Sequence, residues 1–180
     1  MRIIAGQWRG RTLVSPKGDT TRPTSDRTRE ALFSMLHSRL GSFEGLRVLD
    51  LFSGSGALGL EALSRGAGVC TFVEQDRQAL DALRSNIETL KARADIRAQS
   101  ATSLPQASEP YDLILMDPPY GTGAAQVALD RCQRLGWIAP AALISIETGK
   151  TETVQVPGFE IEAERTHGKA KITLLRPVIQ

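Results

Sequence analysis

Two short motifs place an acidic side chain at or after the end of an apolar stretch that is typical of a buried strand. The first motif is Val48-Leu-Asp-Leu-Phe-Ser-Gly-Ser-Gly-Ala-Leu-Gly59, in which Asp50 precedes a glycine-rich turn and then a helix. Gly54 and Gly56 let the backbone approach a ligand where a Cβ would collide, and the first turn of a helix offers unpaired N–H donors. The segment is therefore expected to bind a nucleotide-like ligand.

Two classes of cofactor fit this glycine pattern. Gly54-x-Gly56-x-x-Gly59 satisfies the fingerprint of dinucleotide-binding proteins, and Glu74, at the end of the next expected strand, suits the ribose of either class. Asp50 separates the classes, because a carboxylate repels a pyrophosphate but attracts the sulfonium and α-ammonium groups of S-adenosylmethionine, directly or through water. The sequence therefore favours S-adenosylmethionine. In the competing interpretation, Asp50 only caps the following turn.

The second motif, Asp117-Pro-Pro-Tyr120, follows a strongly apolar run at residues 111–116. Consecutive prolines remove backbone donors and leave rigid carbonyl acceptors, so the Asp117 carboxylate and the Pro118 carbonyl can accept both N–H groups of an exocyclic amine. This favours a pyramidal nitrogen whose lone pair attacks a methyl group in line, through orientation and preorganised electrostatics without a metal. Tyr120 would stack on the base. The competing interpretation is a rigid loop with a packed aromatic ring.

Short apolar strands alternate with amphipathic helices from residue 47 onward, which predicts a parallel sheet with crossover helices. Strands are expected at 47–51, 69–74, 96–99, 111–116 and 143–147, and helices at 25–40, 56–64, 79–90 and 124–135. An antiparallel hairpin is expected at 159–175, and a small hairpin at residues 2–14 is expected to pack beside the main sheet. Both motifs follow strands, so they should share the carboxyl edge where open α/β sheets bind ligands.

Composition fits one globular domain, with 180 residues of which 41% are hydrophobic and 23% charged. No apolar run is long enough to span a membrane, and the two cysteines lie outside any Cys or His cluster, so buried free thiols are expected. Residues 1–30 carry seven basic and three acidic side chains, whereas the remainder carries 15 basic and 17 acidic ones. A basic leader of this kind suits contacts with phosphates, although an ordinary solvated surface fits equally well.

Further stretches, together with the two motifs, resemble the bacterial RsmD family. These stretches are Arg2-Ile-Ile-Ala-Gly-Gln-Trp-Arg-Gly-Arg11, Arg22-Pro-Thr-Ser-Asp-Arg-Thr-Arg-Glu-Ala-Leu-Phe33 and Gly56-Ala-Leu-Gly-Leu-Glu-Ala-Leu-Ser-Arg65. The family consists of class I S-adenosylmethionine-dependent enzymes that methylate guanine N2 in 16S (small-subunit) ribosomal RNA. The resemblance implies an α/β, Rossmann-like fold: a seven-stranded, mostly parallel sheet with an antiparallel last strand, helices on both faces and an N-terminal β-hairpin.

That resemblance spans nearly the whole chain and implies a single methyltransferase domain, with residues 1–24 as an extension and 25–180 as the core. It also implies that Arg22, Thr24 and Asp26 contact the methionine moiety of the donor or shape the cleft, and that Ser100 and Ala101 lie beside the adenine of the donor. In similar proteins the aromatic position after the two prolines varies between Tyr and Phe, so the ring of Tyr120 is expected to matter more than its hydroxyl.

The motifs supply the rest of the expected site. The residues expected to bind the donor are Asp50, Phe52, Ser53, Gly54, Gly56, Glu74, Gln75, Asp76 and Asp117. The catalytic residues are Asp117, Pro118, Pro119 and Tyr120, and the side chains expected to contact RNA are Arg2, Arg9, Arg11 and Arg27. Trp8 either stacks on a base or fixes the hairpin, and Glu147 ends the fifth strand close to the expected cleft.

Other functions remain open at this point. An adenine-N6 methyltransferase of RNA or DNA would use the same Asp-Pro-Pro-Tyr motif, although the short chain argues against a sequence-specific DNA enzyme. A nicotinamide-dependent oxidoreductase or a non-catalytic RNA-binding module could share the fold. The leading interpretation is a cytoplasmic, monomeric, metal-free guanine-N2 methyltransferase that acts on small-subunit ribosomal RNA, either naked or in a ribosomal particle.

Overall fold

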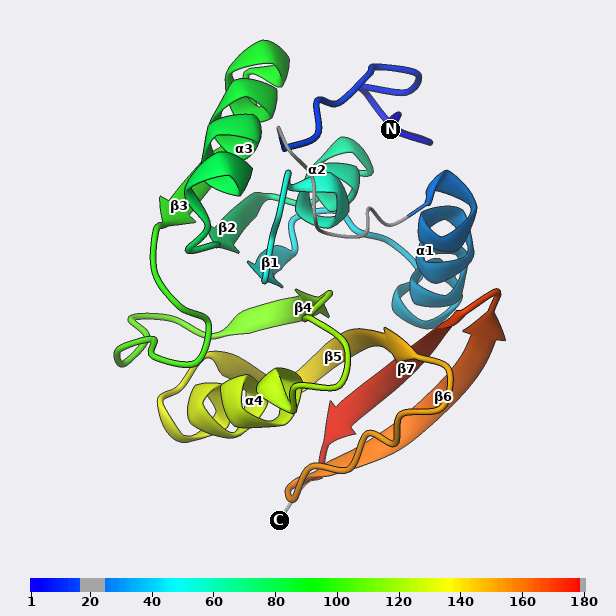
Figure 1. Cartoon of the computed structure of the whole chain (residues 1–180), viewed down its shortest axis with the longest axis vertical. Coiled ribbons are helices and arrows are strands. Elements are labelled where there is room, and N and C mark those ends of the chain that lie inside the picture. The colour runs from blue at the N-terminus through cyan, green and yellow to red at the C-terminus, as the bar shows by residue number, and fades with distance from the viewer. Residues whose placement is uncertain (17–24, 179–180) are drawn as a thin grey trace.

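A seven-stranded sheet with the order β3-β2-β1-β4-β5-β7-β6 forms the centre of the protein (Figure 1). The computed structural model describes residues 1–16 and 25–178. The strands are β1 (Arg47–Leu51), β2 (Val69–Val73), β3 (Ala94–Arg97), β4 (Tyr111–Met116), β5 (Ile138–Gly149), β6 (Phe159–His167) and β7 (Ala170–Pro177). β1 to β5 pair in parallel, and β7 is antiparallel to its neighbours β5 and β6. The expected mostly parallel sheet with a reversed last strand is therefore confirmed.

Helices cover both faces of the sheet, as expected. Three of them, α1 (Asp26–Leu40), α2 (Ala57–Ser64) and α3 (Arg77–Leu90), pack on one face, and α4 (Ala124–Arg134) packs on the other. Successive strand residues point to opposite faces. In β4, Leu113 and Leu115 join the core under α1–α3, whereas Ile114 and Met116 join the core under α4. The continuous apolar run at 111–116 therefore reflects a strand that is buried on both sides.

Three of the five parallel strands differ from their expected bounds, and for β2 the difference is a single residue, since it ends at Val73 instead of residue 74. β3 covers 94–97 instead of 96–99, and β5 begins well before residue 143 because Ile138 already pairs with Tyr111, ahead of a register shift in β4. Cys70 and Cys132 are buried free thiols, as expected, and burial raises the pKa of Cys132 to about 12. No helix within the described ranges 1–16 and 25–178 is both long and apolar enough to cross a membrane.

The N-terminal hairpin is reduced to a single bridge between Arg2 and Thr12. The expectation that it packs beside the sheet is wrong, because the segment lies on α2, where the Gln7 N–H donates to the Ser64 carbonyl at 2.9 Å. The approach is so close that a Cβ on Gly6, whose φ is +89°, would lie 1.8 Å from the Ser64 carbonyl oxygen. The C-terminal end of α2 thus provides acceptors for backbone donors of the segment that would otherwise be unpaired.

Candidate active site

A pocket of about 570 Å³ opens at the carboxyl ends of β1, β2 and β4. Its walls include the turn after β1 with Gly54, the residue after β2, Glu74, and the loop after β4 with Asp117 and Tyr120. Parallel strands end at the same edge of a sheet, and β1 lies between β2 and β4. The two sequence motifs therefore meet in one pocket although they are far apart in the chain.

The structure brings most of the expected site residues to this pocket, but not all of them. Those that line it are Phe52, Ser53, Gly54, Glu74, Gln75, Asp76, Ala101, Asp117, Pro118, Pro119 and Tyr120. Arg22 and Thr24 lie outside the described residues. Asp26, Asp50, Gly56 and Ser100 are not part of the pocket wall.

Asp50 is completely buried beneath α2. Strand alternation points its side chain to the same face as Val48, where its Oδ2 accepts a 3.0 Å hydrogen bond from the Gly59 N–H. Its Oδ1 is buried and has no hydrogen-bond partner in the part of the chain that is described. Burial raises the pKa of this carboxyl well above its usual value, the Gly59 bond opposes the shift, and the charges of Asp117 and Glu74 add to it. The Asp50 carboxyl is therefore buried beneath the residues that line the pocket and is not itself part of the pocket surface.

The glycines of the turn have different roles. A Cβ on Gly54, at φ +57°, would meet nothing within 4 Å, so its backbone is open to the pocket. A Cβ on Gly56 would instead lie 2.5 Å from a Leu83 methyl carbon, so this glycine allows the turn to pack on α3. The expected closeness of Gly56 to a ligand stays a prediction. Phe52 also has a left-handed φ of 59°, which is strained for a bulky residue. The turn is thus shaped by internal packing and by one open backbone position.

Glu74 holds the glycine turn against the end of β2. Its Oε1 accepts a 2.8 Å hydrogen bond from the Gly54 N–H, and its Oε2 accepts from the Gln75 and Asp76 N–H groups at 3.0 and 2.8 Å. A carboxylate offers about four acceptor positions, so one remains for a ligand hydroxyl. Asp76 caps α3 by accepting from the Ala79 N–H at 2.9 Å. Glu74 and Asp76 therefore line the pocket and also stabilise the backbone segments that form its wall.

Two carboxylates attach the Asp117–Tyr120 loop to the end of β5. The Tyr120 hydroxyl donates to Glu147 Oε2 at 2.9 Å, and Glu147 is buried. Glu152 accepts from the Gly121 N–H at 2.8 Å through Oε1 and from the Gly149 N–H at 2.7 Å through Oε2. The loop is consequently fixed at two points just beyond the second proline. Sequence reasoning missed Glu152 because its role depends on the fold of the loop that follows β5.

Part of the pocket wall comes from the N-terminal segment, which sequence reasoning did not assign to it. Met1, Ser15 and Pro16 line the pocket together with the glycine turn. No local pattern marks these positions, because they reach the pocket only when the segment packs on α2 and α3. The remaining lining residues that were not anticipated are Ser55, Ala57, Leu58, Val73, Ala79 and Gln99.

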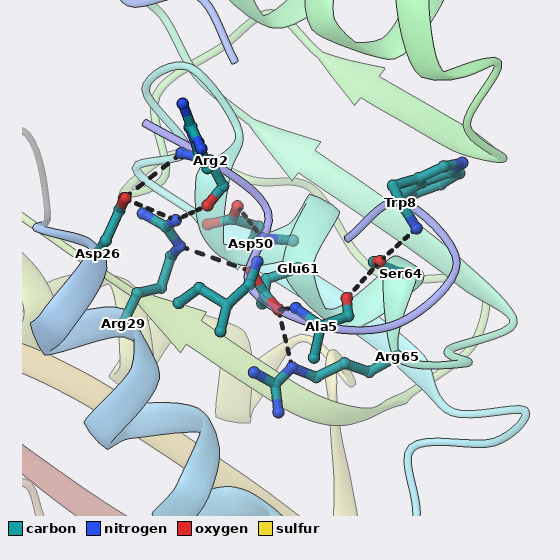
Figure 2. A network of polar contacts seen from close by, with 11 residues as sticks. Arg2, Ala5, Trp8, Asp26, Arg29, Asp50, Glu61, Ser64 and Arg65 are labelled. Carbon is teal, nitrogen blue, oxygen red and sulfur yellow. Dashed lines mark hydrogen bonds and ion pairs between the residues drawn. The ribbon is translucent and has the colours of Figure 1, made fainter. Parts of the chain in front are cut away.

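A buried polar network anchors this segment (Figure 2). The fully buried Arg29 of α1 pairs with Asp26 at 3.0 Å and with the buried Glu61 of α2 at 3.8 Å, and it donates to the Arg2 carbonyl. Glu61 also accepts from the Ile4 N–H at 2.9 Å. The carboxylate of Asp26 faces this network, where it also accepts from the Arg2 N–H at 3.4 Å. The expected contact of Asp26 with the donor stays a prediction.

The expected RNA-contacting residues Arg2, Arg9, Arg11 and Arg27 are all exposed. A second hollow of about 280 Å³, lined by Trp8, Lys91 and Arg93 among others, lies at the C-terminal ends of α2 and α3. Arg11 reaches the same region, since it donates to the Thr89 carbonyl at 3.3 Å. We refer to Arg11, Lys91 and Arg93, together with the exposed Arg9 that follows Trp8 in the chain, as the basic cluster. Trp8 is partly buried against the core and its backbone N–H donates to Ser64 Oγ, so the residue anchors the segment while it borders the hollow.

Among residues 1–16 and 25–178, no three His, Cys, Asp or Glu side chains are grouped so as to hold a metal ion. The groups at the pocket that can do chemistry are paired acids, a rigid Pro-Pro loop and an aromatic ring, and the pocket itself has the size of a nucleotide.

Comparisons with known proteins agree with this arrangement. The family described as conserved hypothetical protein 95 matches residues 1–176. Ribosomal RNA small subunit methyltransferase D of Escherichia coli is 41% identical over 150 residues, covering 82% of this chain and 74% of that protein, and its namesake in Haemophilus influenzae is 38% identical over 175 residues, covering 93% and 89%. The solved structure of the putative methyltransferase yhhF from Escherichia coli superimposes with a TM-score of 0.87, at 38% identity, and covers 100% of this chain and 99% of that one. The chain belongs to the conserved hypothetical protein 95 family, the RsmD family of methyltransferases.

Proposed function

We propose that the protein transfers a methyl group from S-adenosylmethionine to the exocyclic N2 amine of a guanine in 16S ribosomal RNA. The observation that carries the proposal is the meeting of the Gly54 turn and the Asp117–Tyr120 loop in one pocket. The names of the relatives from Escherichia coli and Haemophilus influenzae support ribosomal RNA as the substrate. A ribosomal substrate would place the enzyme in the cytoplasm.

The residues of the pocket fit the proposed donor. Gly54 leaves open space for a ligand, Glu74 keeps an acceptor position, and the buried Oδ1 of Asp50 has no hydrogen-bond partner among the described residues. Burial is the main cause of the raised pKa of Asp50, and the nearby carboxylates of Asp117 and Glu74 raise that pKa further, because their negative charges repel the ionised form of Asp50. A cationic ligand relieves this repulsion, whereas an anionic pyrophosphate increases it. The electrostatics therefore favour a sulfonium compound over a dinucleotide.

The loop after β4 is proposed to hold the base. When bound, S-adenosylmethionine supplies a methyl group on a cationic sulfur. The Asp117 carboxylate and the Pro118 carbonyl accept the two N–H groups of the guanine amine, which turns the nitrogen lone pair toward the methyl group, and Asp117 faces the proton that the amine releases. Tyr120 stacks on the base, and its bond to Glu147 fixes the plane of the ring.

The distance between the reaction pocket and the basic cluster sets a minimum length for an RNA that contacts both. The reaction pocket lies at the N-terminal ends of α2 and α3, and the basic cluster lies at their C-terminal ends. α3 has 14 residues, so the two regions are about 20 Å apart at 1.5 Å per residue. An RNA that occupies both must be folded or extended over that distance. Lys and Arg side chains there would bind its phosphates without reading its sequence.

Transfer from a labelled donor tests the proposal. The purified protein is incubated with methyl-labelled S-adenosylmethionine and unmethylated small ribosomal subunits or naked 16S RNA, and the RNA is digested to nucleosides. The proposal predicts label in N2-methylguanosine, and label in N6-methyladenosine would reject the guanine assignment. Calorimetry separates the cofactor classes: binding of NADH without binding of S-adenosylhomocysteine would overturn the methyl-transfer proposal.

A further inference from the structure

The side-chain amide of Asn86 makes three hydrogen bonds inside the protein. Asn86 lies on α3, is buried, and is the only asparagine in the chain. Its Oδ1 accepts from the Val14 N–H at 2.9 Å, and its Nδ2 donates to the Val14 carbonyl at 3.0 Å and to the Ser55 carbonyl at 2.9 Å. Both amide hydrogens are thus used, and Val14 is held through donor and acceptor at once.

The partners of this amide belong to two different walls of the reaction pocket. Val14 immediately precedes Ser15 and Pro16, which line the pocket, and Ser55 lies in the glycine turn and lines it as well. A third wall, the start of α3 with Ala79, is two helical turns before Asn86 and therefore on the same face of the helix. The Asn86 amide thus connects the N-terminal segment, the glycine turn and α3, and it does so from a buried position outside the pocket.

Only an amide of this length can serve the position. Two carbonyl oxygens and one N–H converge on the side chain, so it must present two donors and one acceptor. An aspartate has the same shape but no donor, and its charge would face the Val14 and Ser55 carbonyl oxygens. An alanine would leave these buried groups without partners, which is costly.

We propose that Asn86 is a positioning residue for the methyl-donor pocket: its amide sets the spacing between the N-terminal segment and the glycine turn. The inference rests on the proposed function for the identity of the ligand. The Arg29–Glu61 network holds residues 2–5 on α1 and α2, and Asn86 independently holds residue 14 on α3. The segment is thereby fixed at both ends, with Ser15 and Pro16 at the pocket.

The first test compares Asn86→Asp with Ser85→Asp, which adds the same charge at the neighbouring, exposed position of α3. Asn86→Asp should weaken S-adenosylhomocysteine binding and raise the KM for S-adenosylmethionine about tenfold, which is the scale of one lost buried hydrogen bond. Its kcat and its KM for RNA should stay within about twofold of wild type. Ser85→Asp should match wild type in all these quantities. Equal affinity of wild type and Asn86→Asp for S-adenosylhomocysteine would overturn the inference.

The second test follows the Asn86 amide directly by NMR and does not depend on methyl-transfer activity. Selective ¹⁵N-asparagine labelling gives one side-chain amide pair, because the chain has a single asparagine. That pair should exchange slowly with solvent and shift when S-adenosylhomocysteine binds, and the Val14 amide should exchange faster in Asn86→Asp than in Ser85→Asp. The inference would be contradicted if the Asn86 amide hydrogens exchanged rapidly with solvent and their chemical shifts did not change when S-adenosylhomocysteine binds.

A third variant keeps the inference testable if Asn86→Asp does not fold. Val14→Pro removes the N–H that Asn86 accepts and leaves α3 intact, and Val14 is 48% exposed. It should reproduce the rise in KM for the donor, and wild-type affinity in this variant would overturn the inference. If wild-type protein itself fails to bind S-adenosylhomocysteine, the proposed function fails instead, so the two failures are distinguishable.

Discussion

The Tyr120 hydroxyl donates a 2.9 Å hydrogen bond to the buried carboxylate of Glu147, so the aromatic ring at the end of the Asp117–Tyr120 loop is attached to the end of β5. The ring also lies close to Gly149, where a Cβ would approach Tyr120 Cδ2 to 3.3 Å. The resemblance to the RsmD family makes the hydroxyl dispensable, whereas this contact gives it a part in orienting the ring.

Two substitutions of Tyr120 separate the ring from the hydroxyl. Tyr120→Phe keeps the stacking surface and should lower kcat/KM for RNA only about fivefold, the scale of one hydrogen bond. Tyr120→Ala removes the surface and should lower kcat/KM about 10- to 100-fold, as expected for a lost base stack. Steady-state methylation assays measure both. Equal losses in the two variants would show that the ring does not stack on the substrate.

Asp117 is predicted to act on the amine. Asp117→Asn keeps the size of the side chain but turns one acceptor into a donor, so kcat should fall about 100-fold, as for other lost electrostatic contacts to a transition state. Affinity for S-adenosylhomocysteine, measured by calorimetry, should change by only a few-fold. Methylation at the wild-type rate in Asp117→Asn would contradict the assigned role.

Ionisation of the buried Asp50 carboxyl at higher pH is predicted to lower the free energy of unfolding. Its folded-state pKa lies well above the usual value of 3.8, mainly because it is buried. Between pH 3.8 and the folded-state pKa, the folded protein binds the Asp50 proton more tightly than the unfolded chain does. The free energy of unfolding should therefore fall as the pH rises through this range. In urea unfolding from pH 4 upward, Asp50→Asn should reduce this decline and bind S-adenosylhomocysteine more weakly. Identical pH dependence in both proteins would contradict the prediction.

The basic cluster is predicted to bind RNA phosphates. The double variant Arg9→Ala/Arg11→Ala should weaken RNA binding and reduce the slope of log affinity against log salt by about 1 to 2, while affinity for S-adenosylhomocysteine stays unchanged. Arg134→Ala/Arg165→Ala removes two exposed charges from α4 and β6 and serves as the matched control. If the two double variants have the same RNA affinity, Arg9 and Arg11 do not contact the substrate.

Glu61 is predicted to be important for stability. Glu61→Gln leaves the buried Arg29 without its full counter-charge and weakens the hold on the N-terminal segment, and breaking a buried pair typically costs about 3–5 kcal/mol. Glu162→Gln makes the same change at a partly exposed ion pair with Arg39 and Arg176, where less than about 1 kcal/mol is expected. Similar free energies of unfolding for the two variants would contradict the prediction.

Hydrophobic periodicity was sufficient to predict the sheet and its helices. β4 illustrates why: a continuous apolar run indicates a strand that is covered on both faces, and its end fixes the place of Asp117. The N-terminal segment could not be placed in this way. Its position depends on Glu61, Ser64 and Asn86, which lie more than 50 residues away in the sequence.

Some features had signals that went unused. Arg29 falls at helical spacing with Leu32 and Leu36, which indicates a buried charge in need of a partner. Asp50 shares strand parity with Val48, so a location under α2 could have been inferred from alternation alone. Ser15 and Pro16, by contrast, carry no local signal of pocket contact, since only tertiary packing brings them there.

A crystal structure with S-adenosylhomocysteine and guanosine would show where the donor and the base bind. We expect the ribose beside Glu74, the sulfur atom facing the Asp117–Tyr120 loop, and the guanine amine within hydrogen-bond distance of the Asp117 carboxylate and the Pro118 carbonyl. A ligand bound with its sulfur atom turned away from Asp117, or a guanine bound outside the pocket, would contradict it.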